Sequence, residues 1–286
     1  NEARAPAATE LRLAAGLDEV MLAVAWHPDA ERVAALAVAF AEAGGARLKI
    51  LSIVDSSLID GPTAMPIGGA HYARRLARIR LTQARDKAAA GTRLATMQAA
   101  TRGIAPIVLH IEGKPVAGHF ACDRQRSLIV MPAGGWFDQG VTLTEEKAAV
   151  AQLALDATPL LLPRGTAPRF DRLLMLHDGG DASEAAIDRF ADHPLLAARH
   201  VAIAGIAGCS ETALNAAASR LGERGHRLEI AGRFSGRDEA DEFAARLARA
   251  DVIVANRALF DASWTSIFGM GTWRIVQRTD RSILLI

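Results

Sequence analysis

Two stretches of the chain decide its fold: EVMLAVAWHPDAERVAALAVAFAE at 19–42 and DRLLMLHDGGDASEAAIDRFADHP at 171–194. Each begins with a short apolar run, passes through a turn and continues with apolar residues at helical spacing. Each is followed by a further strand-like run, SLIVMPAGG at 127–135 and DVIVANRAL at 251–259, and by a short apolar close, TPLLLP at 158–163 and SILLI at 282–286. A repeat of this length is too long for a solenoid unit and predicts two copies of one domain.

Strands alternate with helices in both copies. The expected strands are 20–26, 48–54, 106–111, 127–132 and 159–162 in the first copy, and 172–177, 199–206, 227–232, 251–255 and 282–286 in the second. The later helices are expected at 72–101, 116–124 and 142–155, then at 181–192, 209–224, 236–249 and 266–279. The alternation predicts an α/β fold: two tandem doubly wound domains, each built on a five-stranded parallel sheet with right-handed crossovers. We take the strand order of each sheet to be 3-2-1-4-5.

The repeat also sets the expected domain boundaries. Residues 1–18 form an N-terminal extension, 19–163 the first domain, 164–169 a linker and 170–286 the second domain. The first copy carries an insertion at 55–103, whose role as a lid, an oligomer contact or a longer crossover the sequence leaves open.

Composition excludes several functions. The chain has 286 residues and a net charge of +1, and it lacks a dense basic run, so nucleic-acid binding is not expected. No apolar run reaches the ~18–20 residues of a membrane span, and no signal-peptide pattern opens the chain. Its two cysteines, Cys122 and Cys209, lie in separate copies and form no disulfide framework. A cytoplasmic location is expected.

A ligand crevice is expected where the winding of the sheet reverses. In a parallel sheet of this order that point lies at the carboxyl ends of the first and fourth strands. The turns concerned are 25–29 and 132–142 in the first copy, and 178–182 and 256–269 in the second.

Several motifs resemble those of the universal stress protein family, and the resemblance covers nearly the whole chain after residue 18. Members open with an apolar strand ending in Asp-Gly-Ser and leading into a Ser-containing helix, to which LHDGGDAS at 176–183 is similar. In the first copy the aspartate position is Ala25. Later motifs that resemble the family are LSIVD at 51–55, EGKP at 112–115 and SLIVM at 127–131.

The family's nucleotide loop runs Gly, two residues, Gly, nine residues, then Gly-Ser or Gly-Thr, so that backbone amides can close on phosphates. The second copy holds Asn256, Leu259, Gly269 and Met270 at these four positions, with Gly271-Thr272 as a replacement pair after a register shift. The first copy holds Pro132, Gly135 and the Glu145/Glu146 region, where a carboxylate would repel a triphosphate. The resemblance therefore implies ATP binding in the second copy at most.

The expected ligand-binding residues all lie in the second copy: Asp178, Gly179, Asn256, Arg257, Gly269, Gly271 and Thr272. The resemblance makes Asp178 an adenine or ribose partner, and Arg257 could place a charge near a phosphate. The alternative is that Asp178 only stabilises a turn before a helix. The identity of the ligand stays open.

The sequence gives less support to redox, metal-binding or catalytic chemistry. Cys209 begins a predicted helix, where the dipole could lower a thiol pKa, but packing is the favoured interpretation. The histidines show no metal spacing, and His177 stands out only because it ends a strand beside the expected crevice. The aromatic residues Trp264, Phe268 and Trp273 are either core or an apolar lining of that crevice. No catalytic motif is present, so no catalytic residue and no metal ligand is assigned.

The expected function is that of a cytoplasmic stress-response protein that binds a small ligand or acts as a regulator. The resemblance implies that the apolar runs 159–162 and 282–286 pair with each other, which makes the two domains an internal pseudo-dimer; a homodimer of the whole chain is also open. One alternative is a regulatory region of a longer membrane transporter, motivated by the absence of a starting methionine. Another is slow ATP hydrolysis in the second copy.

Overall fold

The computed structural model describes residues 16–24, 28–59, 69–122, 126–132, 158–165, 170–196, 200–206, 208–234, 239–257 and 279–286. Its first elements are β1 (Glu19–Val24), α1 (Ala30–Gly44), β2 (Arg47–Val54), α2 (Ser56–Ile59), α3 (Ala70–Thr101), β3 (Ile107–Glu112), the 3₁₀ turn η1 (Ala117–Phe120), β4 (Ser127–Val130) and β5 (Leu160–Leu162). The remaining elements are β6 (Arg172–His177), α5 (Asp181–Ala191), the 3₁₀ turn η2 (Pro194–Leu196), β7 (His200–Ile206), α6 (Glu211–Glu223), β8 (Arg227–Phe234), α7 (Ala240–Arg249), β9 (Val252–Ala255) and β10 (Ser282–Leu285).

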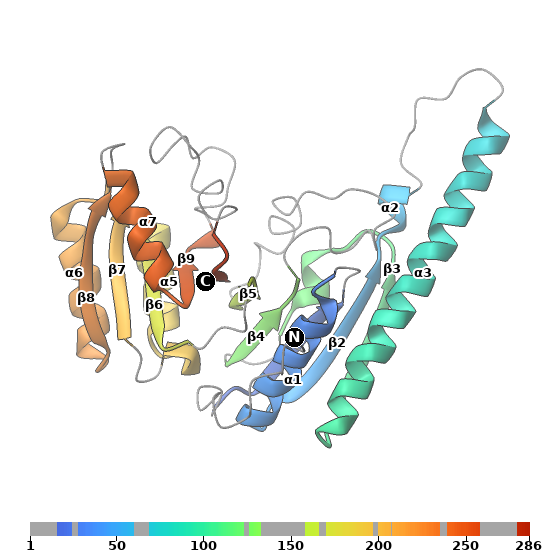
Figure 1. The fold of residues 1–286 in the computed structure, drawn as a ribbon, viewed down its shortest axis with the longest axis horizontal. Coiled ribbons are helices and arrows are strands. Elements are labelled where there is room, and N and C mark those ends of the chain that lie inside the picture. Colours follow the sequence, from blue (N-terminus) through green and yellow to red (C-terminus); the bar gives the residue numbers. More distant parts are fainter. Residues whose placement is uncertain are drawn as a thin grey trace.

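The strands form one ten-stranded sheet of order β3-β2-β1-β4-β5-β10-β9-β6-β7-β8 (Figure 1). We call β1–β5 the first half of this sheet and β6–β10 the second half; each half reads 3-2-1-4-5. Neighbouring strands are parallel within each half, whereas β5 and β10 are antiparallel, with Leu161 opposite Leu284. The fold is therefore α/β with a mixed sheet.

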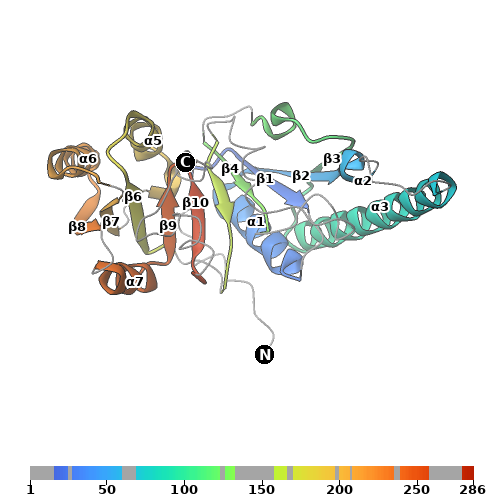
Figure 2. The same ribbon diagram turned by 90° about the horizontal axis from the view of Figure 1, so that it is seen from above.

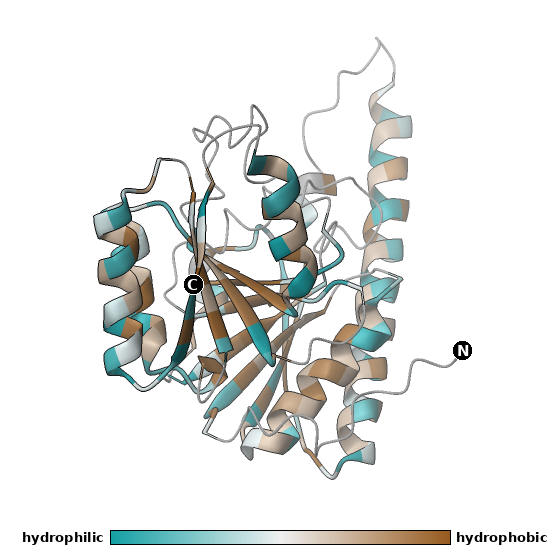
Figure 3. Ribbon diagram, turned by 60° about the vertical axis from the view of Figure 1, so that its left-hand side comes forward, coloured by the Kyte–Doolittle hydropathy of each residue, from teal (hydrophilic) through white to brown (hydrophobic). Residues whose placement is uncertain are grey.

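The central strands are buried on both faces because both faces carry helices. Along β6, Leu173 and Met175 pack into one apolar cluster, while Leu174 and Leu176 pack into another on the opposite face. Helices α5 and α6 cover the first of these faces and α7 covers the second (Figure 2). Figure 3 shows the same arrangement as hydrophobic strands beneath helices that carry hydrophilic residues. A continuous apolar run is the sequence signature of such strands.

The insertion at 55–103 contributes the crossover from β2 to β3. Its main element, α3, packs on α1 and β2 through small buried residues, which allow the helices to approach closely. These residues are Ala84, Ala88, Ala95 and Ala99. Near its start Tyr72 is 71% exposed, so this part of α3 projects beyond the core.

Three predicted helices either differ from the structure or lie outside the described residues. The helix predicted at 116–124 is only the 3₁₀ turn η1, because Ala121 is already extended and Phe120 is completely buried as an anchor. The helices predicted at 142–155 and 266–279 lie outside the described residues. Helix α1 ends at Gly44, and the following Gly45 adopts the left-handed conformation that terminates helices.

The two halves share one apolar core. The larger cluster includes residues from both, and the rings of Phe40 on α1 and Phe170 before β6 meet edge to face with centroids 5.6 Å apart. Near the start of β10, the Arg164 backbone amide donates to the Ser282 hydroxyl at 3.2 Å. The halves are thus joined by backbone pairing, aromatic packing and polar contacts.

Candidate functional site

The candidate site lies at the carboxyl ends of β6 and β9. These strands are parallel neighbours with Leu176 opposite Ala255, so Asp178 and Asn256 follow at the same edge of the sheet. From β6 the chain passes through α5 to β7, which lies on one side of β6, whereas β9 and then β10 lie on the other side of β6. The winding reverses between β6 and β9, which is where ligands bind in open α/β sheets.

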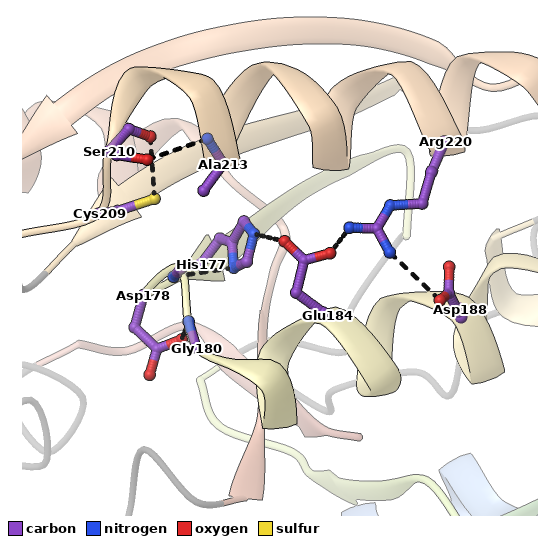
Figure 4. Close-up of polar contacts among 10 residues, drawn as sticks. His177, Asp178, Gly180, Glu184, Asp188, Cys209, Ser210, Ala213 and Arg220 are labelled. Carbon is purple, nitrogen blue, oxygen red and sulfur yellow. Dashed lines mark hydrogen bonds and ion pairs between the residues drawn. The ribbon is translucent and has the colours of Figure 1, made fainter.

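The turn between β6 and α5 is held by two side chains. The Gly179 amide donates to His177 Nδ1 at 3.2 Å, and the Gly180 amide donates to Asp178 Oδ1 at 2.9 Å. Gly179 has a φ of +82°, a conformation that glycine adopts without a Cβ penalty. The turn therefore orients the carboxylate of Asp178 and uses one of its two oxygens (Figure 4).

A polar network connects this turn to α5 and α6. His177 is completely buried, and its Nε2 lies 3.1 Å from Glu184 Oε1. Glu184 forms an ion pair with Arg220 of α6, whose Nη1 lies 3.2 Å from Asp188 Oδ2 (Figure 4). Because Nδ1 accepts the Gly179 hydrogen bond, the ring proton lies on Nε2 and is donated to Glu184.

The ring of His177 is a positioning group. Burial lowers its pKa from the ordinary value; the nearby Arg220 cation acts in the same direction and the Asp178 carboxylate opposes them. The imidazole is consequently neutral near pH 7. Its two ring nitrogens are both engaged, one by the Gly179 amide and one by Glu184, so the ring holds the turn.

Cys209 packs beside the same turn. Its side chain is buried, and a Cβ built on Gly179 would lie 3.5 Å from its Sγ. Burial raises the pKa of the Cys209 thiol, as does the Asp178 carboxylate, while Arg233 acts in the opposite direction. A raised pKa is the reverse of what a redox-sensing thiolate requires, which supports the packing interpretation.

Asn256 and Arg257 are each only 7% exposed. The guanidinium of Arg257 donates to the carbonyl oxygen of Thr158, and its amide donates to Ile286 O at 3.2 Å. Arg257 therefore joins the ends of β5 and β10, so its Nη2 faces the backbone before β5. The other expected ligand residues, Gly269, Gly271 and Thr272, lie outside the described residues.

At the corresponding edge of the first half, the structure describes a small cavity with an apolar lining. Between the end of β1, the start of α1 and the helix α3 lies a cavity of only about 10 Å³, which would hold about one water molecule. Its lining includes Val24, Ala30, Leu94 and Pro132. The turns 25–27 and 133–142 lie outside the described residues.

Sequence reasoning missed Glu184, Asp188 and Arg220. These residues belong to two different helices, and no local spacing brings α6 to α5; only the folded sheet does. Within the described residues, no group of three or more His, Cys, Asp or Glu side chains is arranged to hold a metal ion. In the same residues, no helix combines the length and apolar character that crossing a bilayer requires.

Comparison with solved structures identifies similar folds. A universal stress protein from Archaeoglobus fulgidus DSM 4304 matches with a TM-score of 0.55 and 17% identity, covering 93% of this chain and 95% of that one. A putative universal stress protein from Pseudomonas aeruginosa UCBPP-PA14 has 14% identity, a TM-score of 0.44 and coverages of 96% and 94%. A functionally unknown protein from Pseudomonas aeruginosa PAO1 has 15% identity, a TM-score of 0.46 and coverages of 96% and 93%.

No family model matches the sequence, and no curated protein matches it. At 17% identity, the Archaeoglobus match establishes a likeness of fold over nearly the whole of both chains. The chain therefore has a universal stress protein-like fold.

Proposed function

We propose that the chain is a tandem stress-response protein that binds a small polar, nucleotide-like ligand in its second half and works as a regulator in the cytoplasm. In this proposal residues 19–163 and 170–286 are two domains of one type, with 164–169 between them, and they face each other through β5 and β10 as an internal pseudo-dimer. The fold likeness over 93% of the chain and the same strand order in both halves support the tandem arrangement.

The observation that carries the ligand proposal is the position of Asp178. Its Oδ1 holds the Gly180 amide at 2.9 Å, which fixes the carboxylate at the winding reversal. Its Oδ2 can then accept a hydrogen bond from a ligand hydroxyl or amino group, as a ribose or an adenine offers. The proposed site is completed by Gly179, Asn256, Arg257, Gly269, Gly271 and Thr272. In this site Arg257 holds the start of β5 and the end of β10 together through its hydrogen bonds to Thr158 and Ile286.

Ligand binding is assigned to the second half alone. In the first half Ala25 replaces the aspartate, and the described walls at the end of β1 are apolar around a cavity of about 10 Å³. An apolar wall offers no hydrogen-bond partner to a polar ligand, so binding there would leave polar groups unsatisfied.

A binding role is favoured over catalysis by the state of two titratable groups at the site. Burial keeps the imidazole of His177 neutral and raises the pKa of the Cys209 thiol. Both side chains are buried, and a general base or nucleophile must come within hydrogen-bond reach of the ligand.

Calorimetric titration with ATP and Mg²⁺ tests the proposal, together with mass spectrometry of any ligand that copurifies. Saturable binding is expected, with loss of at least tenfold in affinity in Asp178→Ala. The matched control Asp241→Ala removes an exposed carboxylate from α7, on the other face of the sheet, and should bind like the wild type. Equal affinity in both variants would contradict the assignment of the site. ATP hydrolysis that survives Asp178→Ala would do so as well.

A further inference from the structure

A second recess lies at the opposite end of β6 from Asp178. It opens at the amino ends of β6, β7 and β8, beneath the last turn of α7, and encloses about 330 Å³. Six strand residues separate the two ends of β6, a distance of about 20 Å. The recess is therefore a separate place in the fold and shares no residue with the site around Asp178.

The recess has an apolar floor and a cationic rim. Leu174 and Ala202 lie on the α7 face of the sheet and Ala250 follows α7, which together provide the floor. Arg172 begins β6 and Arg249 ends α7, so the two arginines line the recess from two different elements. Both of these residues are exposed.

The charges around the recess are unbalanced. Its one carboxylate, Glu229, is engaged by Arg246 at 2.7 Å and by His200 at 3.7 Å. Just outside the recess, Asp251 Oδ2 accepts the backbone amides of residues 171 and 172. Within the described part of the chain, the guanidinium groups of Arg172 and Arg249 make no ion pair, whereas Arg246 is shared between Glu229 and Glu242.

At the equivalent place in the first half, a buried carboxylate lies between two cationic side chains. Strand register makes Glu19 the counterpart of Arg172, because Val20 faces Leu128 on β4 as Leu173 faces Val252 on β9. The Glu19 carboxylate is completely buried between Arg47 Nη2 at 2.9 Å and Lys49 Nζ at 3.0 Å. In the first half, the positive charges of Arg47 and Lys49 are therefore paired with a carboxylate of the chain itself.

The second half has no carboxylate at the position of Glu19; its one lining carboxylate, Glu229, lies on β8 and is paired with Arg246. Register puts His200 where the first half has Arg47, and Ala202 where it has Lys49. Arg172 replaces the carboxylate of Glu19 by a cation, and the methyl group of Ala202 leaves the volume of a lysine side chain empty. The result is a cationic hollow in place of a closed ion cluster.

We propose that this recess binds a small organic anion, with a carboxylate or phosphate group between Arg172 and Arg249 and a compact apolar body on Leu174 and Ala202. Guanidinium groups match the planar, two-oxygen face of such anions. A volume of about 330 Å³ lies within the range of small-molecule pockets. The proposal stands independently of the site around Asp178.

Calorimetric titration of the full chain with naphthalene-2-carboxylate tests this, with naphthalene-2-carboxamide as the neutral probe of the same shape and inorganic phosphate as the head group alone. The carboxylate should bind saturably and at least tenfold more tightly than the carboxamide. Arg172→Gln combined with Arg249→Gln should weaken it at least tenfold, since each substitution removes a charge-assisted hydrogen bond. Phosphate binding that depends on the same two arginines would extend the site to phosphate esters.

Two further variants complete the design. Arg189→Gln removes an exposed arginine of α5, on the opposite face of the sheet, and should leave the affinity unchanged. Ala202→Glu should abolish binding by restoring a tethered carboxylate. Absence of saturable binding, equal binding of the carboxamide, or full affinity in the double arginine variant would overturn the proposal; in the last case Arg249 would serve only the carboxyl end of α7.

Discussion

The imidazole of His193, just beyond α5, lies 3.2 Å from the carbonyl oxygen of Ser127 at the start of β4, so a hydrogen bond crosses from the second half of the sheet to the first. The ring is buried and stacks on Phe190 with centroids 5.2 Å apart. Because Leu195 N donates to its Nδ1 at 3.3 Å, the proton lies on Nε2 and is donated to Ser127. His193 therefore joins the two halves as a neutral ring.

This relationship predicts an acid-sensitive stability. Burial lowers the pKa of His193 to about 4, against 6.5 for the unfolded chain. Between these two pH values the unfolded chain binds a proton on His193 and the folded chain does not. The contribution of the neutral His193 to the free energy of unfolding is therefore fully present above pH 6.5 and is lost as pH falls toward 4. At its full size this contribution to the free energy of unfolding is about 3 kcal/mol.

Urea denaturation between pH 7.5 and 4.5 should show a weaker pH dependence of the free energy of unfolding in His193→Gln. The exposed control His71→Gln should behave like the wild type, and an unchanged slope in His193→Gln would contradict the assignment.

Gly179→Ala should destabilise the turn that carries Asp178. A φ of +82° costs a residue with a Cβ about 1–2 kcal/mol. The matched control Gly222→Ala lies within α6 without a positive φ and should instead stabilise by up to about 1 kcal/mol. The free energies of unfolding of both variants, measured in urea, check this pair. Equal effects would mean that the left-handed turn is not retained.

Phe40→Ala should weaken the core shared by the two halves. Its ring is completely buried and meets Phe170 edge to face, and such truncations cost about 3–5 kcal/mol. Tyr72→Ala, which removes a 71% exposed ring from α3, should change the free energy of unfolding by less than about 0.5 kcal/mol. A single unfolding transition in Phe40→Ala would fit one cooperative core. Separate transitions of the two halves would contradict it.

Cys209 should be the slower of the two thiols to react. Its side chain is 2% exposed and burial raises the pKa of its thiol, whereas Cys122 is partly exposed. Treatment of the folded protein with iodoacetamide at pH 7.5, followed by peptide mass spectrometry, should show Cys122 modified first. Faster modification of Cys209 would restore the redox interpretation, which requires a reactive thiolate.

The sequence was informative where local patterns decide structure. The strands 172–177 and 282–285 and the helices near 72–101 and 181–192 were predicted within two residues, because apolar runs and helical spacing are local signals. The strand order taken for each half, 3-2-1-4-5, agrees with the sheet, although the alternation of strands and helices itself predicts only parallel strands and right-handed crossovers. The prediction of a helix at 116–124 was wrong: the chain forms only the 3₁₀ turn η1 and is already extended at Ala121.

The site was harder to predict, because its contacts join distant segments. Asp178 and Gly179 were recognised from the turn motif, but the hydrogen bond that His177 donates to Glu184 and the ion pair between Glu184 and Arg220 depend on how α5 lies against α6. From the sequence, Arg257 was expected to place its positive charge near a phosphate group. In the structure its guanidinium instead donates to the carbonyl oxygen of Thr158, just before β5. The recess at Arg172 depends on the register of three strands, which no single motif records.

Hydrogen–deuterium exchange with and without saturating ATP and Mg²⁺ tests the central claim, ligand binding by the second half alone, most directly. The account predicts slower exchange at the turn 178–183 and at 256–257, with unchanged exchange at 28–34 at the start of α1. Slower exchange at 28–34 alone, or no slowing at 178–183 when ATP is bound, would contradict it.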